Sequence, residues 1–446
     1  MARAKKEAAT PEERLQAALV PDWERPYKLP ENWCWTTVGA INQYVGISAD
    51  PTKAKNKTFE LYSVPSSADN YPEIVLGADI GSTKQSVKKG DVLLCKINPR
   101  INRVWKVSKY TDHSLLASSE WIVIRNSGLI SNYLMWCFRS PYFRGYMLSN
   151  VSGVGGSLMR AQPKFVQGYP VPVPPLAEQQ RIVDRIESLF AKLDEAKEKA
   201  QAVVDSFETR RAAILHKAFT GELTAKWREE HGVSIDNWKT TRFDSVAAIR
   251  SNLVDPAEYQ SFPHIAPDNI EKKTGVLLEY HTIAEDGVTS GKHRFYSGQI
   301  LYSKIRPYLS KAVVVDFDGL CSADMYPIEA YQNARCLWYY MLSDEFLLQA
   351  STAGSRSVLP KINQKELSAL TLHLPTNDRE QEEIARILDE LFDKEQQTKE
   401  AAEVVLDQID LMKKSILARA FRGELGTNDP SEEGAVELLK EIIRRG

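Results

Sequence analysis

The stretches that come nearest to catalytic motifs in this 446-residue sequence are all incomplete. Asn98-Pro99-Arg100 lacks the second proline and the aromatic residue of an NPPY-type methyltransferase motif. SGVGGS (152–157) contains glycines but no apolar strand before them, which a cofactor-binding loop requires. PDNIEKK (267–273) places the acidic residues of a nuclease motif too close together, so a chance match is the better interpretation.

Motifs for metals and nucleotides are missing from the sequence as well. The seven histidines show no metal-ligand spacing, and no GxxxxGK[ST] loop is present for ATP. The five cysteines are scattered and form no CxxC pair, which indicates reduced thiols in a cytoplasmic protein. No apolar run reaches the roughly 20 residues that span a bilayer, and the N-terminus lacks the apolar core of a secretory signal. We therefore expect a non-catalytic cytoplasmic chain without a metal, a cofactor or a membrane contact of its own.

Polar side chains gather instead after two similar turns, in GDVLLCKINPRINRVWKV (90–107) and GQILYSKIRPYLSKAVVV (298–315). Both stretches share a glycine, an apolar run and the sequence Lys-Ile-x-Pro. Arginine can bind guanine through two hydrogen bonds, asparagine can read adenine, and lysine suits phosphate. The candidate DNA-binding residues of these turns are Lys96, Asn98, Arg100, Asn102, Arg103 and Lys106 in the first, and Lys304, Arg306, Tyr308 and Lys311 in the second. The alternative is a rigid proline turn with solvated charges.

Two Gly/Ser-rich loops are the second candidates for phosphate contact. They read SNVSGVGGSLMR (149–160) and STAGSRSVLPK (351–361). Their exposed backbone N–H groups, together with Arg160, Arg356 and Lys361, could hold phosphates. A flexible surface turn explains the same composition equally well.

The net charge of −2 conceals an uneven distribution along the chain. Residues 29–175 carry 16 Lys and Arg against 9 Asp and Glu, whereas residues 377–425 carry 8 against 13. Residues 224–376 are close to balance. A basic module in a nearly neutral chain is compatible with phosphate binding by one face.

The chain is an internal duplication. AILHKAFTGEL (213–223) and SILARAFRGEL (415–425) match at seven of eleven positions with an offset of 202. The Lys-Ile-x-Pro turns repeat at an offset of 208, and PVPPLAEQQRIVDRI (172–186) corresponds to LPTNDREQEEIARIL (374–388). Each copy therefore has a mixed globular part of about 150 residues, with helical stretches at 131–147 and 334–348, followed by a long helix.

The long helices carry apolar stripes at the spacing of a coiled-coil seam. Arg210 interrupts the first stripe, and Glu395 and Thr398 interrupt the second. Asn377 and Glu380 suggest a capping box for the second helix, and Gly221 and Gly423 lie where helices end. The residues expected to pair the helices are Ile186, Leu189, Leu193, Val203 and Phe207 in the first helix, and Leu388, Leu391, Val405, Ile409 and Met412 in the second.

The order of these elements resembles the specificity (S) subunit of type I restriction–modification systems. The resemblance covers residues 29–425 and rests on LPENWCWTTVGAI, PVPPLAEQQRIVDRIE and AFTGELTAKWR, with the degenerate second copies NWKTTRF, LPTNDREQEEIARILDELF and AFRGEL. It implies an α+β fold with two globular target-recognition domains, two long antiparallel coiled-coil helices and an internal pseudo-two-fold duplication. The expected segments are an N-terminal extension (1–28), a first recognition domain (29–175), a first spacer helix (176–223), a second recognition domain (224–376), a second spacer helix (377–425) and a C-terminal tail (426–446).

The resemblance also implies a function. Each recognition domain would read one half of a divided site in double-stranded DNA, and the paired helices would hold two methyltransferase (M) subunits. S-adenosylmethionine, and the ATP and Mg used with restriction (R) subunits, would then be bound by the partners. A structural adaptor with a coiled coil and no base readout is the alternative. The extension and the tail have no counterpart in the resemblance, although Val436, Leu439, Ile442 and Ile443 predict a short amphipathic helix.

Overall fold

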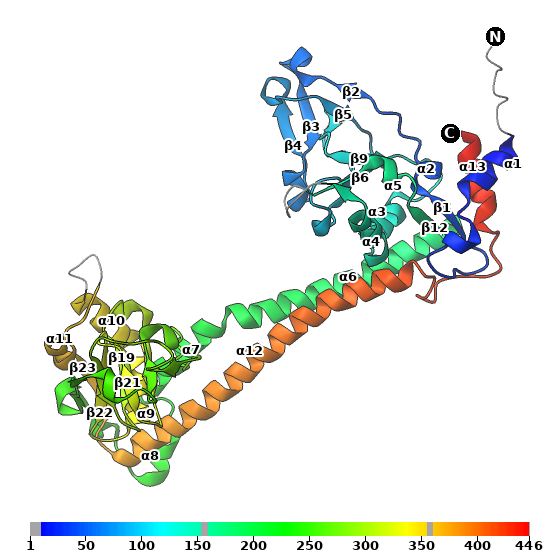
Figure 1. Ribbon diagram of the computed structural model, residues 1–446. Helices are drawn as coiled ribbons and strands as arrows, with labels where there is room; N and C mark the ends of the chain where they lie inside the picture. Colours follow the sequence, from blue (N-terminus) through cyan, green and yellow to red (C-terminus); the bar gives the residue numbers. More distant parts are fainter. Residues whose placement is uncertain (1–9, 153–158, 355–359, 446) are drawn as a thin grey trace. The chain divides into compact units, whose positions relative to one another are not determined.

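The computed structural model of the protein describes residues 10–152, 159–354 and 360–445. It divides into two compact units (Figure 1), the first comprising residues 1–199 and 405–446 and the second residues 200–404. Both boundaries fall inside long helices, so each unit contains one globular part and a portion of both helices. The duplication predicted from the sequence is confirmed by the element order, which repeats in the second unit.

The globular part of the first unit contains a five-stranded sheet of order β2-β5-β8-β3-β4 and a three-stranded sheet of order β7-β6-β9. Strands β6 and β9 are the apolar runs VLLC and WIVI, and all of their residues are buried. The strands are β1 (Cys34–Thr37), β2 (Ser48–Ala49), β3 (Thr58–Tyr62), β4 (Glu73–Leu76), β5 (Lys84–Ser86), β6 (Val92–Cys95), β7 (Val104–Lys106), β8 (Ser114–Ala117), β9 (Trp121–Ile124), β10 (Val151–Ser152), β11 (Arg160–Ala161) and β12 (Pro170–Val173). The helices are α2 (Val38–Ile41), α3 (Ser131–Arg139), α4 (Pro141–Ser149) and α5 (Pro163–Val166).

The globular part of the second unit repeats this plan. Its five-stranded sheet has the order β15-β18-β21-β16-β17, and a four-stranded sheet has the order β14-β22-β19-β20. The strands are β13 (Trp238–Arg242), β14 (Ala247–Ile249), β15 (Leu253–Val254), β16 (Pro263–Ile265), β17 (His281–Thr282), β18 (Lys292–Phe295), β19 (Ile300–Ser303), β20 (Ala312–Val314), β21 (Gly319–Cys321), β22 (Met325–Ala330) and β23 (Thr371–Pro375). The helices are α8 (Ala225–His231), α9 (Ala334–Met341), α10 (Asp344–Ala353) and α11 (Gln364–Ala369).

Each helical stretch predicted within a globular part consists of two helices. Ser140 ends α3, and its hydroxyl accepts a hydrogen bond from the Phe143 amide to cap α4, which starts at Pro141. Ser343 caps α10 in the same way through the Phe346 amide. The helical stretches expected at 131–147 and 334–348 are therefore present, but each consists of two helices, because a serine cap starts a new helix inside it.

The long helices are α6 (Leu176–Asp205), α7 (Phe207–Phe219) and α12 (Asp378–Ala420). Residues 176–223 were expected to form one helix, but this helix is interrupted at Ser206, between α6 and α7. The Ser206 hydroxyl donates a hydrogen bond of 2.6 Å to the Ala202 carbonyl oxygen, a contact that favours a bend in a helix. Its counterpart α12 has no interruption over 43 residues.

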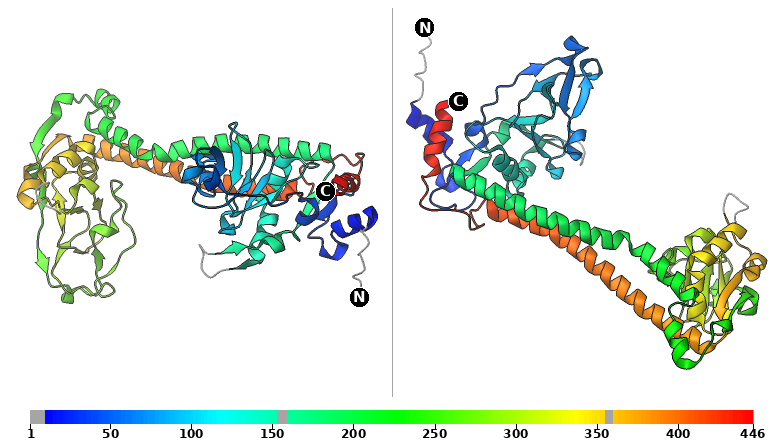
Figure 2. Two further views of the ribbon diagram at one scale, coloured as in Figure 1. Left: turned by 90° about the horizontal axis from the view of Figure 1, so that it is seen from above. Right: turned by 180° about the vertical axis from the view of Figure 1, so that it is seen from behind.

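Within each unit the two helices pair in an antiparallel manner (Figure 2). In the first unit Lys197 lies 3.6 Å from Asp410, and Asp194 forms an ion pair with Lys413. As the residue numbers rise along α6, those of the partner residues on α12 fall, so the two helices run antiparallel. In the second unit Arg210 lies 2.7 Å from Glu395, so two of the polar residues that interrupt the apolar stripes bind each other.

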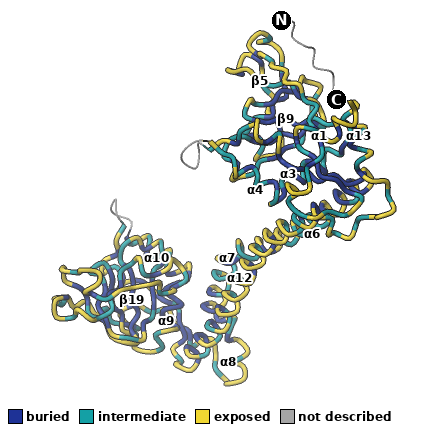
Figure 3. Tube along the Cα trace, turned by 45° about the vertical axis from the view of Figure 1, so that its right-hand side comes forward, coloured by how far each residue is buried: buried dark blue, intermediate teal, exposed yellow. Residues whose placement is uncertain are grey.

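Buried, half-buried and exposed residues follow one another along the long helices (Figure 3). Most residues of the predicted seam are buried or half-buried, but two are exposed. Val405 is 40% exposed and Met412 is 49% exposed, so the structure does not place them between the helices. Ile409 is buried as predicted, and Leu406, which was not predicted, is half-buried. Val405 and Leu406 are adjacent apolar residues, and this made the stripe ambiguous by one position.

The repeated phrase at the end of each helix has a structural role in its own unit. Gly221 and Gly423 have φ angles of +80° and +75°, as expected for residues that end a helix. Three residues beyond Gly221, Thr224 donates a hydrogen bond of 2.8 Å to Glu380, in the first turn of α12. In the first unit Thr427 donates one of 2.6 Å to Glu178, in the first turn of α6. Each exit turn is thus fastened to the start of the other long helix.

The predicted capping box of the second helix is half correct. The Asn377 side chain accepts hydrogen bonds from the Arg379 and Glu380 amides, as a cap should. The Glu380 carboxylate, however, binds the hydroxyl of Thr224, the guanidinium of Arg228 and the indole of Trp238 rather than the Asn377 backbone. A buried carboxylate that accepts hydrogen bonds from several donors is more stable than one in a solvent-exposed capping box.

The N-terminal extension and the C-terminal tail pack together on the first unit. Helix α1 (Pro11–Ala18) contacts α13 (Ala435–Arg445), the amphipathic helix predicted from the sequence (Figure 1). Leu439 and Ile442 are buried in the core of this unit with Leu15 of α1. The tail is also held by Arg181, whose guanidinium forms two hydrogen bonds of 2.8 Å to Glu432. The tail is therefore a part of the first unit.

All five cysteines are buried and unpaired, as predicted. Burial raises the pKa of the Cys34 thiol to about 12. Across the described residues, no helix has both the length and the apolar character needed to cross a membrane.

Candidate nucleic-acid interface

The two Lys-Ile-x-Pro turns have the same unusual backbone. Each is a short 3-10 helix, Pro99–Ile101 or Pro307–Leu309, between two residues in the left-handed region. The φ angles are +45° and +53° at Asn98 and Asn102, and +49° and +47° at Arg306 and Ser310. Residues other than glycine adopt this conformation at a cost, so its occurrence at both turns is a feature of the duplicated design.

Hydrogen bonds from a second segment stabilise these strained residues. The Asn98 amide donates to the Met159 carbonyl oxygen at 2.8 Å, and the Arg306 amide donates to that of Pro360 at 2.7 Å. β-bridges join Ile97 to Arg160 in the first unit, and Ile305 to Lys361 in the second. Each turn thus lies against the end of a Gly/Ser loop, so the structure brings the two sets of candidates together. Residues 153–158 and 355–359, and with them Arg356, lie outside the described residues.

Arg100 and Arg306 are the most available cations of the turns. Both are exposed, and across the described ranges neither side chain has a hydrogen bond or an ion pair. Tyr308, at the place of Arg100 in the second turn, is 48% exposed. The apolar Ile101 beside Arg100 is 54% exposed, and the sequence analysis did not single it out. The two turns therefore share one backbone conformation but present side chains of different chemistry at their tips.

Other candidates are already engaged inside their own domains. Asn102 donates to the Arg139 carbonyl oxygen at 3.2 Å, Lys106 to Asn132 at 2.5 Å and Lys311 to the Pro267 carbonyl oxygen at 2.7 Å. These bonds give the three residues a structural role. Lys304 lies over the ring of Tyr326, with its nitrogen 5.2 Å from the ring centre.

Two candidates at the ends of the Gly/Ser loops are paired with carboxylates. Arg160 lies 3.3 Å from Glu120, and Lys361 lies 3.0 Å from Asp324. Lys96 and Asn98 are half-buried beside the first pair, as is Arg103. Glu120 and Asp324 were not recognised in the sequence, because only the fold brings them to the turns.

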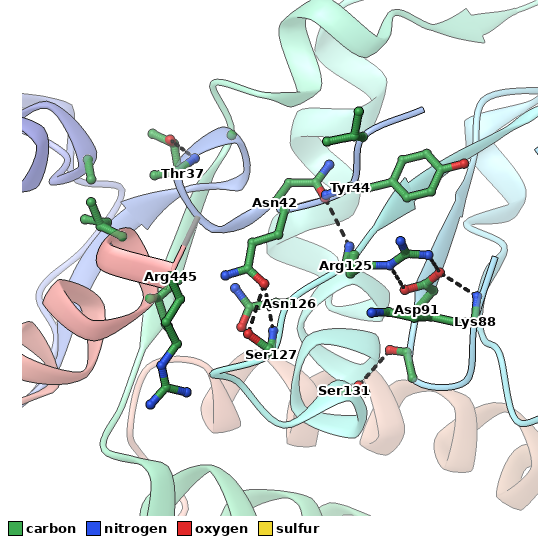
Figure 4. Close-up of a pocket in the computed structure, with 18 of the residues that line it drawn as sticks. Thr37, Asn42, Tyr44, Lys88, Asp91, Arg125, Asn126, Ser127, Ser131 and Arg445 are labelled. Carbon is green, nitrogen blue, oxygen red and sulfur yellow. Dashed lines mark hydrogen bonds and ion pairs between the residues drawn. The ribbon is translucent and has the colours of Figure 1, made fainter. Parts of the chain in front are cut away.

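A hollow in the first unit lies elsewhere, beside the residues that precede β6 (Figure 4). Its volume is about 1080 Å³, and none of the candidate DNA-binding residues lines it. Arg125 binds Asp91 through two hydrogen bonds of 2.8 and 2.6 Å on its wall, and Ser131 donates to the Gly90 carbonyl oxygen. These polar groups of the wall bind one another and so support the fold.

Comparison with known proteins gives a consistent result. The family model of the type I restriction modification DNA specificity domain matches residues 46–204 and again residues 235–405. The type I restriction enzyme EcoDI specificity subunit of Escherichia coli is 36% identical over 345 residues, which are 73% of this chain and 76% of that protein. The EcoKI specificity subunit of Escherichia coli strain K12 is 22% identical over 438 residues, covering 89% of this chain and 90% of that protein.

Solved structures of similar fold cover most of the chain. The HsdS subunit from Thermoanaerobacter tengcongensis aligns with a TM-score of 0.63 at 20% identity, covering 90% of this chain and 100% of that chain. A chain from a study of complex assembly and conformational transition of the type I R-M system aligns with a TM-score of 0.70 at 21% identity and the same coverage. At these identities the likeness concerns the fold, and it agrees with the two domains and paired helices described above.

Proposed function

Because the chain belongs to the family of type I restriction–modification specificity subunits, we propose that each globular part binds one half of a divided, asymmetric DNA target. Membership of the family makes the chain a non-catalytic subunit that recognises DNA and takes part in a restriction–modification complex. The division of the target between the two globular parts is the step that the proposal adds.

The observation that carries the proposal is the pair of Lys-Ile-x-Pro turns. One backbone frame occurs in both units, and it presents Asn98 and Arg100 in the first but Arg306 and Tyr308 in the second. Side chains of different hydrogen-bonding pattern read different base edges. Two domains with the same frame and different tips would therefore read two different half-sites.

The proposal extends to the partners and their cofactors. Two methyltransferase subunits would bind the faces of the long helices that do not pair. On α12, the apolar residues Val405 and Met412 are exposed and lie seven residues apart, on one side of the helix, which suits a protein contact. S-adenosylmethionine would be bound by those subunits, and ATP and Mg²⁺ would serve restriction subunits where a system has them. The complex would act on DNA in the cytoplasm.

Replacing one arginine in each turn tests the division of labour. Arg306→Ala should weaken binding of the target duplex by about 1–3 kcal/mol and relax base preference in one half-site only, because a base contact carries sequence information. Arg100→Ala should do the same in the other half-site and is the matched control. The measurement is a mobility-shift titration of the complex with its methyltransferase subunit, on duplexes altered in one half-site at a time.

Three other outcomes of this titration have clear meanings. A loss that is uniform over all duplexes would show that the arginine contacts phosphate. Unchanged binding by both variants would remove the turns from the interface. Equal binding of target and random duplex by the unaltered complex would favour a structural adaptor without base readout.

A further inference from the structure

A carboxylate accompanies the candidate interface in both units. The backbone amide of Lys96 donates to the carbonyl oxygen of Glu120 at 2.9 Å, and that of Lys304 donates to Asp324 at 3.0 Å. These bonds place the two acidic residues at the same position of the duplicated frame. Each forms an ion pair with the cation at the end of a Gly/Ser loop, Arg160 in the first unit and Lys361 in the second.

Both members of the pair have changed between the two copies while the opposite charges have remained. The first unit has arginine with glutamate, and the second has lysine with aspartate. Packing alone does not select for this result, because the four side chains differ in length and shape. The shared property is a cation held by a carboxylate.

Stability is a weak explanation for these ion pairs. The Arg160 and Glu120 side chains are 56% and 26% exposed, and those of Lys361 and Asp324 are 46% and 42% exposed. Ion pairs this close to solvent contribute little to folding. In addition, one carboxylate oxygen of Glu120 is buried without a hydrogen-bond partner in the described part of the protein. A negative charge at a surface that must approach phosphates needs another reason.

Discrimination between DNA sequences supplies that reason. Lysine and arginine attract the phosphates of any duplex, and this attraction does not depend on sequence. A cation that is occupied by a carboxylate contributes less to such binding, and the carboxylate itself repels the DNA backbone. Once a correct half-site has docked on the adjacent turn, close approach of a phosphate can compete for the cation.

We propose that Glu120 and Asp324 are specificity-determining residues, each of which withholds one cation from non-target DNA. The proposal rests on the DNA-binding function above, since it concerns the same two surfaces. The two carboxylates weaken the binding of non-target DNA and do not read bases. One such ion pair serves each half-site.

The variants Glu120→Gln and Asp324→Asn remove the charge and nearly preserve the shape. In the complex with the methyltransferase subunit, each variant should bind a random duplex about fivefold more tightly at low salt. The dependence of log K on log salt should steepen by about 0.9, because one more phosphate is contacted. Affinity for the target duplex should rise less, so the ratio of target to random binding should fall. Fluorescence anisotropy over a salt series measures all three quantities.

A double substitution separates this mechanism from a structural one. In an Arg160→Gln background, Glu120→Gln should leave the salt dependence of random-duplex binding unchanged and should raise the affinity by less than in the native background, because no cation remains to be released and only the repulsion by the carboxylate is removed. Urea unfolding of the same variants should show little change in either background. A loss of folding stability that accounts for the binding change would overturn the proposal, as would unchanged random-duplex affinity in the single variant.

Base reading by Glu120 is the remaining competitor. It predicts an altered preferred half-site for Glu120→Gln even in the Arg160→Gln background, and that outcome also contradicts the proposal. Failure of the underlying function would look different. In that case the unaltered complex itself would fail to prefer any duplex, whereas failure of the present proposal leaves the preference of the unaltered complex intact.

Discussion

Replacement of Glu380 by alanine is expected to lower the free energy of unfolding of the second unit by about 3–5 kcal/mol. The Glu380 carboxylate is fully buried and accepts hydrogen bonds from Thr224, Arg228, Asn237 and Trp238, at 2.7 to 3.0 Å. Its removal leaves the Arg228 guanidinium, whose side chain is 11% exposed, without a counter-charge. Hydrogen exchange of peptides from residues 225–245 and 371–385 measures the loss locally.

The internal duplication offers a control for this variant. Glu178 is the counterpart in the first unit, but its donors are Thr427 and the more exposed Arg181. Glu178→Ala should therefore cost less, about 1–2 kcal/mol. Equal losses from the two substitutions would contradict this interpretation of the buried cluster.

The two carboxylates should also respond to acid in opposite directions. At Glu380 burial raises the pKa, but the hydrogen bonds from Asn237, Arg228, Thr224 and Trp238 outweigh it, and the pKa is lowered. At Glu178 burial prevails over its donors, and the pKa is raised. Glu380 therefore contributes stability above the ordinary glutamate pKa that is lost as the pH falls through its lowered value. The contribution of Glu178 is present below the ordinary pKa and falls as the pH rises through its raised value.

Leu439→Ala should destabilise the first unit by about 2–5 kcal/mol, because it leaves a cavity where α13 enters the core. Leu439 is fully buried in that core. Because α1 contacts α13, amides of residues 11–18 should lose protection from hydrogen exchange together with those of residues 435–445.

Substitution on the outer side of the same helix is the matched control. Glu441 pairs with Arg445, and both side chains are about 60% exposed, so Glu441→Gln should leave exchange in α1 unchanged. If Leu439→Ala affects α13 alone, the N-terminal extension does not depend on the tail for its position.

The duplication was the most predictable feature, because the repeated residues have local structural roles. Gly221 and Gly423 end helices through positive φ angles, and apolar residues at helical spacing predicted the pairing of the long helices. The register of one stripe was not predictable. Where two apolar residues are adjacent, as at Val405 and Leu406, spacing alone cannot decide which of them faces the partner helix.

The candidate interface was predictable only in part. The proline turns stood out because Lys-Ile-x-Pro occurs twice, but their contact with the ends of the Gly/Ser loops depends on bridges between distant residues such as Ile97 and Arg160. For the same reason the acidic residues Glu120 and Asp324 gave no signal. Asn102, Lys106 and Lys311 have the residue types of DNA contacts, and only the structure reveals their bonds within the domain.

The buried carboxylate of Glu380 illustrates the same limit. Its position three residues after Asn377 predicted a capping box, which is a local interaction. The donors that it binds come from residues 224–238, about 150 positions earlier in the chain. Local spacing predicts local bonds, and a long-range network that competes for the same side chain is invisible to it.

Mapping of methylated bases in DNA from cells that express this chain with its methyltransferase subunit tests the central claim most directly. The account predicts one divided target whose two half-sites differ in sequence and are separated by unread base pairs. Arg306→Ala should relax one of the half-sites and leave the other unchanged. A continuous target without a gap, two identical half-sites, or methylation that is the same without this chain would contradict it.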